Sequence, residues 1–341
     1  MKAKHVIIYL LLVIVTSSCI RDEAPNAEAD ILSCRLPGIT MTTSPIINNN
    51  SVTLFVTPGT NISALAPEFT LTSGATITPA SGTERNFNSP QEYQVTAADG
   101  IWKKTYAISV IDTELATIYN FEDTISGKKY YIFVERENDK VIMEWASGNA
   151  GYAMTGVAKT ADDYPTFQIA NGKNGKCLSL VTRSTGFFGG LVGMPIAAGN
   201  LFIGSFDVNN AMSNPLQATK FGLPFRHVPT YLAGYYKYKA GDQFTEGGKP
   251  VEGKRDICDI YAIMYETSVS VPTLDGTNAF TSPNLVSMAR IKDAKETDEW
   301  TYFKLPFTTL PGKFIDKEKL TMGKYNISVS YTHLRAHETL M

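Results

Sequence analysis

The pattern that most constrains the fold of this chain is the alternation of apolar and polar residues in short runs that are separated by turns. The clearest case is Gln91–Val110, in which Tyr93 and Val95 alternate with polar neighbours until Asp99-Gly100, after which the alternation resumes. A period of two places apolar side chains on one face of a strand, and Asp-Gly between two such runs is typical of a β-hairpin. No segment of helical length carries a period of 3.6 residues. The chain is therefore predicted to be all-β.

The first group of predicted strands lies in residues 31–111. Its runs are short and end at turn residues such as Pro58-Gly59 and Gly74. This pattern predicts an immunoglobulin-like β-sandwich. The region has no histidine and only isolated acidic residues, so nothing in it indicates catalysis.

The second group of predicted strands lies in residues 118–328. Alternating runs such as Asp259–Glu266 and Trp300–Phe307 predict a second sandwich, of the jelly-roll type. A short polar linker, Asp112–Thr117, separates the two groups. Because such linkers usually join independently cored units, few contacts are expected between the sandwiches.

The start of the chain is not expected to belong to either sandwich. Lys2 and Lys4 precede the apolar run Val6–Val15, which is too short for the roughly 20 residues that span a bilayer. Small residues then precede Cys19, so residues 1–18 resemble a bacterial lipoprotein signal peptide with Cys19 as the lipid-bearing residue. An ordinary secreted protein cleaved near this position is the alternative. The acidic stretch 19–30 is poor in large apolar residues and is predicted to be a flexible tether.

Charge and cysteine content narrow the function. A formal net charge of −2 gives no electrostatic reason to expect nucleic acid as a partner. Besides Cys19, the chain has Cys34, Cys177 and Cys258, an odd number without CxxC spacing. A disulfide between Cys177 and Cys258 remains open for an exported protein, although buried free thiols are favoured.

The last residues, 329–341, do not follow the alternating pattern. They resemble a translated sequencing adapter and are expected to be a non-native tail, which would leave the second domain truncated. His333 and His337 lie in this tail and His5 lies in the signal peptide, so His227 is the one histidine considered for a site. A multi-histidine zinc site is thereby excluded, and a catalytic triad has no nucleophile motif to support it.

A glycoside hydrolase needs two carboxylic acids about 5–10 Å apart. The second domain has enough acids for such a pair, but their spacing singles out none, and Asp259 and Glu266 are expected on opposite faces of one strand. The candidates are Glu122, Asp123, Glu144, Asp256, Asp259 and Glu266.

A ligand site is predicted where aromatic residues accompany hydrogen-bonding groups, because a sugar ring stacks on aromatic faces while its hydroxyls take the polar groups. The stretch Leu201–Asp242 is rich in aromatics, and Tyr235 should point outward while Tyr236 and Tyr238 point into the core. Most of these aromatics could instead fill the sandwich, and Trp145 could be a core residue. The predicted site residues are Trp145, Asn149, Tyr152, Arg226, His227 and Tyr235.

Several motifs occur in an order that resembles one family. They are YNFED from Tyr119, WASGNAGYAM from Trp145, GKCLSLVT from Gly175, LFIGSF from Leu201, GYYKYKAGD from Gly234 and DIYAIMYE from Asp259. Together they resemble the putative carbohydrate metabolism domain family of surface lipoproteins in gut anaerobes, in which an Ig-like domain precedes a jelly roll similar to carbohydrate-binding modules. The resemblance implies a glycan partner, a lipid anchor in the outer membrane at the cell surface, and a structural calcium with Glu122 as first ligand.

Three function classes follow. The leading one is a surface-tethered lipoprotein that binds carbohydrate without catalysis. The second is a glycoside hydrolase with a carboxylate pair, and the third is a structural or adhesion lipoprotein. Aromatics on an exposed groove would favour the first, facing acids in a cleft the second, and a featureless face the third.

Overall fold

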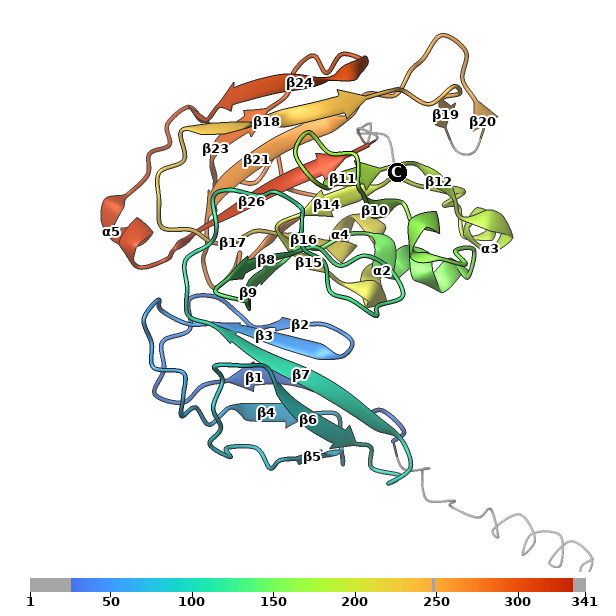
Figure 1. Cartoon of the computed structure of the whole chain (residues 1–341). Coiled ribbons are helices and arrows are strands. Elements are labelled where there is room, and N and C mark those ends of the chain that lie inside the picture. Colours follow the sequence, from blue (N-terminus) through green and yellow to red (C-terminus); the bar gives the residue numbers. More distant parts are fainter. Residues whose placement is uncertain (1–25, 247–248, 334–341) are drawn as a thin grey trace, which may run out of the picture.

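The computed structural model describes residues 26–246 and 249–333, in which two β-sandwiches lie one above the other (Figure 1). One sheet of the first sandwich pairs β1 with β4, and the other has the order β2-β3-β7-β6-β5. The predicted hairpin is confirmed as β6 and β7, with Gly100 of its turn at a φ of 71°. The seven strands are β1 (Ile31–Arg35), β2 (Ile46–Ile47), β3 (Ser51–Phe55), β4 (Glu68–Leu71), β5 (Thr76–Thr78), β6 (Gln91–Thr96) and β7 (Lys103–Ile111).

The alternation in these strands fills the first core. Tyr93 and Val95 of β6 are buried, together with Tyr106 and Ile108 of β7. The core begins before β1, because Ala29 is buried within it. The main chain of residues 26–30 also bonds to the sandwich, through Glu28 to the hydroxyl of Thr72 for example. The prediction of a tether up to residue 30 is therefore wrong for these five residues.

The second sandwich is built on a six-stranded sheet with the order β14-β26-β21-β23-β25, in which β17 also pairs with β26. The pair β18–β24 covers this sheet and forms the uppermost layer in Figure 1. The strands of these two layers are β14 (Asn200–Phe202), β17 (Leu223–Pro224), β18 (Tyr231–Tyr238), β21 (Asp259–Glu266), β23 (Leu285–Arg290), β24 (Thr297–Pro306), β25 (Thr308–Thr309) and β26 (Tyr325–Thr332).

Short hairpins and helical turns complete the second sandwich. The strands are β8 (Val134–Glu137), β9 (Lys140–Glu144), β10 (Thr166–Ile169), β11 (Cys177–Leu180), β12 (Arg183–Ser184), β13 (Ile196–Ala197), β15 (Gly204–Phe206), β16 (Thr219–Phe221), β19 (Thr245–Glu246), β20 (Lys249–Pro250) and β22 (Leu274–Asp275). The described helices are α2 (Asn149–Tyr152), α3 (Gly186–Leu191), α4 (Pro215–Ala218) and α5 (Lys317–Thr321). The all-β class and the sandwich architecture are thus confirmed.

Apolar side chains from both layers form the second core. Ile260 and Ala262 of β21 belong to the same cluster as Leu232 of β18 and Phe303 of β24. Strand β21 is packed on both faces, so seven of its eight residues are buried. The sheet and its covering pair are therefore held together by burial of apolar surface, at roughly 25 cal/mol per Å².

Strand β26 shows that the predicted limit of the second domain at residue 328 is wrong. It pairs with β21 along its whole length, from Glu266↔Tyr325 to Asp259↔Thr332. Val329 is buried in the second core, and the ring of Tyr331 packs beside that of Trp145. His333 follows the strand, and its backbone N–H donates to the carbonyl of Gly199. Residues 329–333 are therefore part of the fold.

The two sandwiches share an apolar contact, contrary to the expectation of few contacts between them. Phe55 at the end of β3 and Ile111 at the end of β7 are buried in the core cluster of the second sandwich. The linker is tied down as well, since Asp112 pairs with Lys140 at 2.7 Å and Leu115 packs on the same cluster. The first sandwich is consequently fixed against the second.

The remaining predictions of organisation are met in part. Cys177 and Cys258 are not joined by a disulfide, and burial raises the pKa of Cys34 to about 12. Among the described residues no helix is long and apolar enough to cross a membrane. The predicted signal peptide, Cys19 and the end of the tail after residue 333 lie outside the described residues.

Candidate functional site

The six predicted site residues do not form one site. Trp145 is only 2% exposed and belongs to the second core. Its ring packs edge-on against Tyr119, and its indole N–H donates to the carboxylate of Glu135 at 2.9 Å. A side chain enclosed in this way cannot stack on a sugar, so Trp145 is a core residue.

Asn149 and Tyr152 are also buried, for a reason that the sequence pattern concealed. The glycine-punctuated stretch after Trp145 forms helix α2 rather than an open turn. The side-chain amide of Asn149 donates to the carbonyl of Thr166 and accepts from its N–H, at 2.7 and 3.1 Å. The hydroxyl of Tyr152 donates to the carbonyl of Ser184. Both residues hold neighbouring segments together and present nothing to a ligand.

Arg226 and His227 lie beside the first sandwich. The guanidinium of Arg226 donates to the carbonyl of Thr321 at 3.3 Å, near the end of α5. The imidazole of His227 contacts the carboxylate of Glu114 in the linker at 2.5 Å. They line a small crevice between the sandwiches. The contact of His227 holds the linker and that of Arg226 holds the end of α5, so both side chains are engaged away from the outward side chains of β18.

Tyr235 is the predicted site residue that the structure leaves available. Its side chain is 48% exposed, whereas Tyr238 is buried and Tyr236 half-buried, as the period of two predicts. It lies opposite Tyr302 of β24 in the strand register, with ring centroids 5.3 Å apart. Tyr302 is 55% exposed. Two neighbouring rings are thus open to solvent on the outside of the covering pair.

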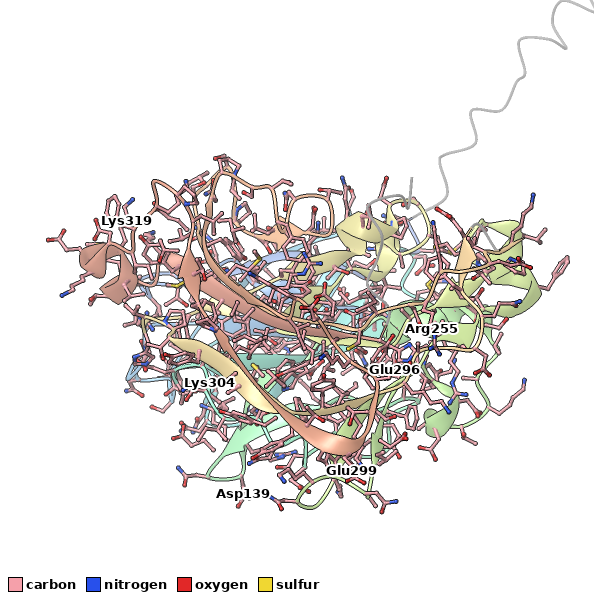
Figure 2. The ribbon with its side chains drawn as sticks, turned by 90° about the horizontal axis from the view of Figure 1, so that it is seen from above. Asp139, Arg255, Glu296, Glu299, Lys304 and Lys319 are labelled. Carbon is pink, nitrogen blue, oxygen red and sulfur yellow. The ribbon has the colours of Figure 1, made fainter. Side chains whose placement is uncertain are left out.

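Further aromatic rings continue this surface along the two strands. Tyr231, 54% exposed, lies four residues before Tyr235 on the same side of β18, a distance of about 13 Å in an extended strand. Trp300 is half-buried and contacts Lys237, the outward residue next to Tyr235 on β18. We call Tyr231, Tyr235, Trp300 and Tyr302 the aromatic face. Figure 2 looks down on this layer, with Lys304 of β24 labelled.

Lysines lie over three of the four rings of the aromatic face. The ammonium of Lys304 lies 4.1 Å from the ring centroid of Tyr231, and that of Lys173 lies 4.3 Å from that of Tyr235. Lys237 lies 5.4 Å from the ring of Trp300. Lys173 comes from the loop between β10 and β11, which therefore reaches over the covering pair. These are cation–π contacts, worth about 0.5–1 kcal/mol each at exposed positions.

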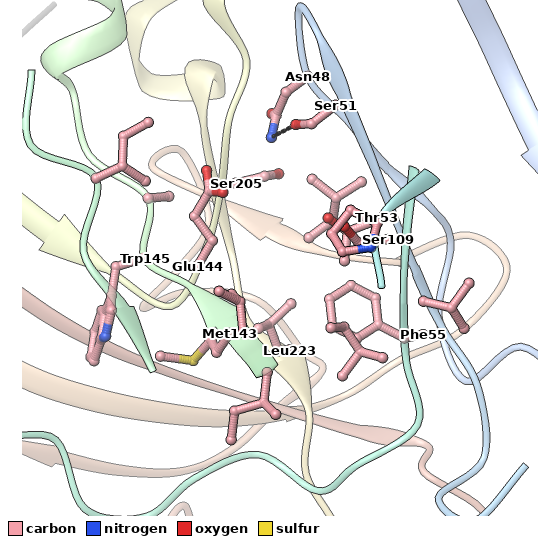
Figure 3. A pocket seen from close by; sticks show the side chains of 18 of the residues that line it. Asn48, Ser51, Thr53, Phe55, Ser109, Met143, Glu144, Trp145, Ser205 and Leu223 are labelled. Atoms are coloured by element: carbon pink, nitrogen blue, oxygen red, sulfur yellow. Dashed lines mark hydrogen bonds between the residues drawn. The ribbon is translucent and has the colours of Figure 1, made fainter. Parts of the chain in front are cut away.

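A second hollow lies between the two sandwiches (Figure 3). This interdomain cleft has a volume of about 630 Å³. From the first sandwich it is lined by polar residues such as Asn48 and Ser51, and from the second by Glu144 and Ser205 (Figure 3). The apolar side chains of Phe55, Met143 and Leu223 also line it (Figure 3). Its size lies within the range of small-molecule sites.

Carboxyl groups near the cleft have altered acidity. The side chain of Glu144 reaches water, but the walls of the cleft remove part of its hydration; this desolvation raises its pKa above the ordinary value, and the charge of Lys128 partly offsets the rise. Burial likewise raises the pKa of Glu135, against the hydrogen bond from the indole of Trp145, and the charge of Asp123 raises it further. Glu144 and Asp139 are the two acids among the residues that line the cleft.

Glu122, the predicted calcium ligand, is held by the loop before β11. Its carboxylate accepts a hydrogen bond from the backbone N–H of Lys176 at 2.9 Å. Between residues 26 and 333, apart from 247–248, no group of three or more His, Cys, Asp or Glu side chains gathers as it would around a metal ion. Calcium prefers six to eight oxygen ligands, so a calcium ion at Glu122 would need most of them from carbonyl groups or water.

The two-sandwich fold agrees with the comparisons to known proteins. The family described as "Putative carbohydrate metabolism domain" matches residues 120–333, which is more than half of the chain. The chain belongs to this family. A second family, described as "SGBP, N-terminal", matches residues 31–110. The putative carbohydrate metabolism domain thus spans the second sandwich through the end of β26, which includes residues 329–332.

Two solved structures similar to this member of the putative carbohydrate metabolism domain family are each described as a putative glycoside hydrolase. One, from Bacteroides thetaiotaomicron, has 84% sequence identity and a TM-score of 0.89, with 92% of each chain covered. The other, from Bacteroides vulgatus, has 47% identity and a TM-score of 0.59, with 63% of this chain and 87% of that chain covered. A search of curated proteins finds no match.

Proposed function

We propose that this protein is a surface-tethered lipoprotein that binds carbohydrate through the aromatic face of its second sandwich. The observation that carries the proposal is the pair Tyr235 and Tyr302, two half-exposed rings side by side on adjacent strands. Sugar rings present C–H groups on their faces, and these pack on aromatic rings while the hydroxyls remain hydrogen-bonded. Membership of a carbohydrate-related family supports the same ligand class.

The geometry of the aromatic face favours a glycan chain over a single sugar. Tyr231 and Tyr235 are separated by about 13 Å along one strand, which is longer than one sugar ring. The rings sit on paired strands and not on loops, so their positions are fixed before binding and little entropy is lost. An exposed array of this kind also argues against a purely structural role, for which a featureless face was expected.

The test is alanine substitution of Tyr235 and Tyr302, with binding measured on an array of oligosaccharides and by calorimetry. Loss of one stacking ring should weaken binding by roughly 1–3 kcal/mol, which is about five- to 150-fold in Kd. Trp102→Ala is the matched control, because Trp102 is 63% exposed but lies in the first sandwich. Unchanged glycan binding by folded Tyr235→Ala and Tyr302→Ala proteins would refute the proposal.

The location of the protein follows from the same proposal. Cys19 would carry the lipid and hold the protein in the outer membrane, facing the outside of the cell. The match of residues 31–110 to the "SGBP, N-terminal" family supports a place in the envelope. In a Bacteroides host, Cys19→Ala should move the protein out of the membrane fraction and abolish labelling with a fatty-acid probe. Retention of both would contradict lipidation at Cys19.

Glycoside hydrolysis is the second candidate, and Glu144 is the observation that favours it. A carboxyl group with a raised pKa in a cleft of about 630 Å³ has the property that a general acid needs. The two similar structures described as putative glycoside hydrolases point the same way. The assay is release of reducing sugar from the array oligosaccharides that bind. Activity that disappears in Glu144→Gln would support this candidate, and activity that survives in it would remove Glu144 from the mechanism.

A further inference from the structure

The lysines of the aromatic face are held by rings and not by carboxylates. Lys304 and Lys173 lie 4.1 and 4.3 Å from the ring centroids of Tyr231 and Tyr235. In the described part of the chain, neither of them nor Lys237 takes part in a salt bridge. Each ammonium therefore retains its full charge for another partner.

Three lysines gather on this surface although the whole chain carries a formal net charge of −2. Outward positions of β18 and β24 hold Lys237 and Lys304, and the loop after β10 adds Lys173. The exposed acids Asp298 and Glu299 lie at the far end of β24 from Lys304, before Trp300. Three cations and four aromatic rings are thereby interleaved along one layer.

Stacking of a sugar on these rings must change the position of the lysines. The ammonium groups of Lys304 and Lys173 cover ring faces that a sugar would occupy. A displaced ammonium group loses its cation–π contact, worth about 0.5–1 kcal/mol at an exposed site. An anionic group on the stacked sugar compensates for this loss by pairing with the displaced lysine, whereas a neutral sugar offers only hydroxyls.

We infer that the aromatic face selects anionic glycans, in which sugar rings carry carboxylates or sulfate esters. This inference rests on the proposed glycan binding and narrows its substrate class. The rings stack on any sugar. Discrimination between anionic and neutral sugars comes from the lysines, Lys173, Lys237 and Lys304. Carboxylate and sulfate present the same negative charge to a lysine, so the two sources are separated by experiment.

The experiment compares oligosaccharides that differ only in charge. The array carries chondroitin oligosaccharides of one length in four forms: unsulfated, sulfated, carboxyl-reduced but sulfated, and carboxyl-reduced and unsulfated. It also carries oligogalacturonides with their neutral methyl esters, and neutral xylan, mannan and β-glucan oligosaccharides. The charged member of a bound pair should bind at least about tenfold more tightly than its neutral form, and the preference should shrink at high salt because exposed charges are screened.

Each outcome of the array decides one of the two proposals. If the charged and neutral members of every bound pair bind equally, or only neutral glycans bind, the inference is refuted while glycan binding stands. If none of the oligosaccharides binds, the proposed function itself falls. Comparison of the unsulfated form, which carries only carboxylates, with the carboxyl-reduced sulfated form, which carries only sulfates, then shows which group is recognised.

Lysine variants test the residues assigned to this selection. Lys304→Met and Lys173→Met keep the apolar stem and remove the charge, and each should weaken binding of the best anionic oligosaccharide by about two- to fivefold, the range of one exposed ion pair. Binding of a neutral oligosaccharide should stay the same or improve, because a ring is uncovered. Lys103→Met, an exposed lysine of the first sandwich, is the control. Equal losses for anionic and neutral glycans would assign the lysines a packing role and overturn the inference.

Discussion

Replacement of Tyr331 by alanine tests whether the last described strand is part of the fold. The ring of Tyr331 packs on those of Trp145 and Phe121, with centroids 6.1 and 5.8 Å apart. Burial and the charge of Glu135 raise the pKa of its hydroxyl. Removing a fully buried aromatic ring costs about 3–5 kcal/mol. Because Tyr331 retains some exposure, we expect a loss of about 2–4 kcal/mol in the free energy of unfolding of the second sandwich.

Urea unfolding followed by tryptophan fluorescence measures this loss. Trp145 is buried beside Tyr331 and reports on the second sandwich, whereas Trp102 of the first sandwich is already exposed. With an m-value of about 2–3 kcal/mol per molar urea, a loss of about 3 kcal/mol lowers the midpoint by roughly 1 M. Tyr302→Ala is the matched control, since an exposed position should change stability by less than about 0.5 kcal/mol. If the urea midpoint of Tyr331→Ala differs from that of wild type by no more than the midpoint of Tyr302→Ala does, the assignment of residues 329–332 to the fold is refuted.

Three further predictions concern charged groups. Asp259 is 4% exposed and accepts three hydrogen bonds from the guanidinium of Arg290, of 2.6, 3.0 and 3.1 Å. Asp259→Ala should therefore cost about 2–4 kcal/mol in the free energy of unfolding measured with urea, whereas Glu246→Ala, in an exposed pair, should cost less than about 0.5 kcal/mol. Equal losses for the two variants would contradict this prediction. Folding raises the pKa of Glu144, so its ionised carboxylate lowers the free energy of unfolding at pH values above its ordinary pKa of 4.5 and has no such effect at lower pH. Glu144→Gln should therefore raise the melting temperature at pH 7 and leave it unchanged below pH ~4. A melting temperature below that of wild type at pH 7 would contradict the raised pKa. The hydrogen bond from Lys104 lowers the pKa of Asp30. The ionised Asp30 therefore contributes its full stabilisation to the fold at pH values above its ordinary pKa of 3.8, and this stabilisation is lost as the pH falls below that value. A melting curve of Asp30→Asn measured against pH should lose that acid dependence, and retention of the full dependence would assign it to other groups.

Local patterns predicted the parts of the fold that depend on neighbouring residues. The β6–β7 hairpin follows from alternation and from Asp99-Gly100, both of which act within a few residues. The end of the second domain was missed because β26 is packed on both faces and also buries polar residues. Ser328 and Ser330 are 0% and 2% exposed, and the hydroxyl of Ser328 donates to the carbonyl of Ile203. A strand of this kind shows no period of two.

The candidate site was predictable only where it depends on one strand. The outward direction of Tyr235 follows from the period of two, but its neighbour Tyr302 is brought beside it by the register of β18 with β24. The contact with Lys173 depends on a loop from another part of the sandwich. Sequence spacing does not encode such pairings. The assignment of Trp145 and Asn149 failed because the buried hydrogen bonds that hold them are also nonlocal.

The contact between the sandwiches determines how the aromatic face is presented. Phe55 and Ile111 are embedded in the second core, so the first sandwich acts as a rigid arm and not as a swivelling spacer. Strand β1, where the arm begins, lies in the sandwich farther from β18 and β24 (Figure 1). The aromatic face therefore has a set orientation relative to β1, at the start of the first sandwich. If the proposed glycan binding holds, a bound chain would meet the rings from one direction relative to the first sandwich, because the two sandwiches cannot swivel freely about Phe55 and Ile111.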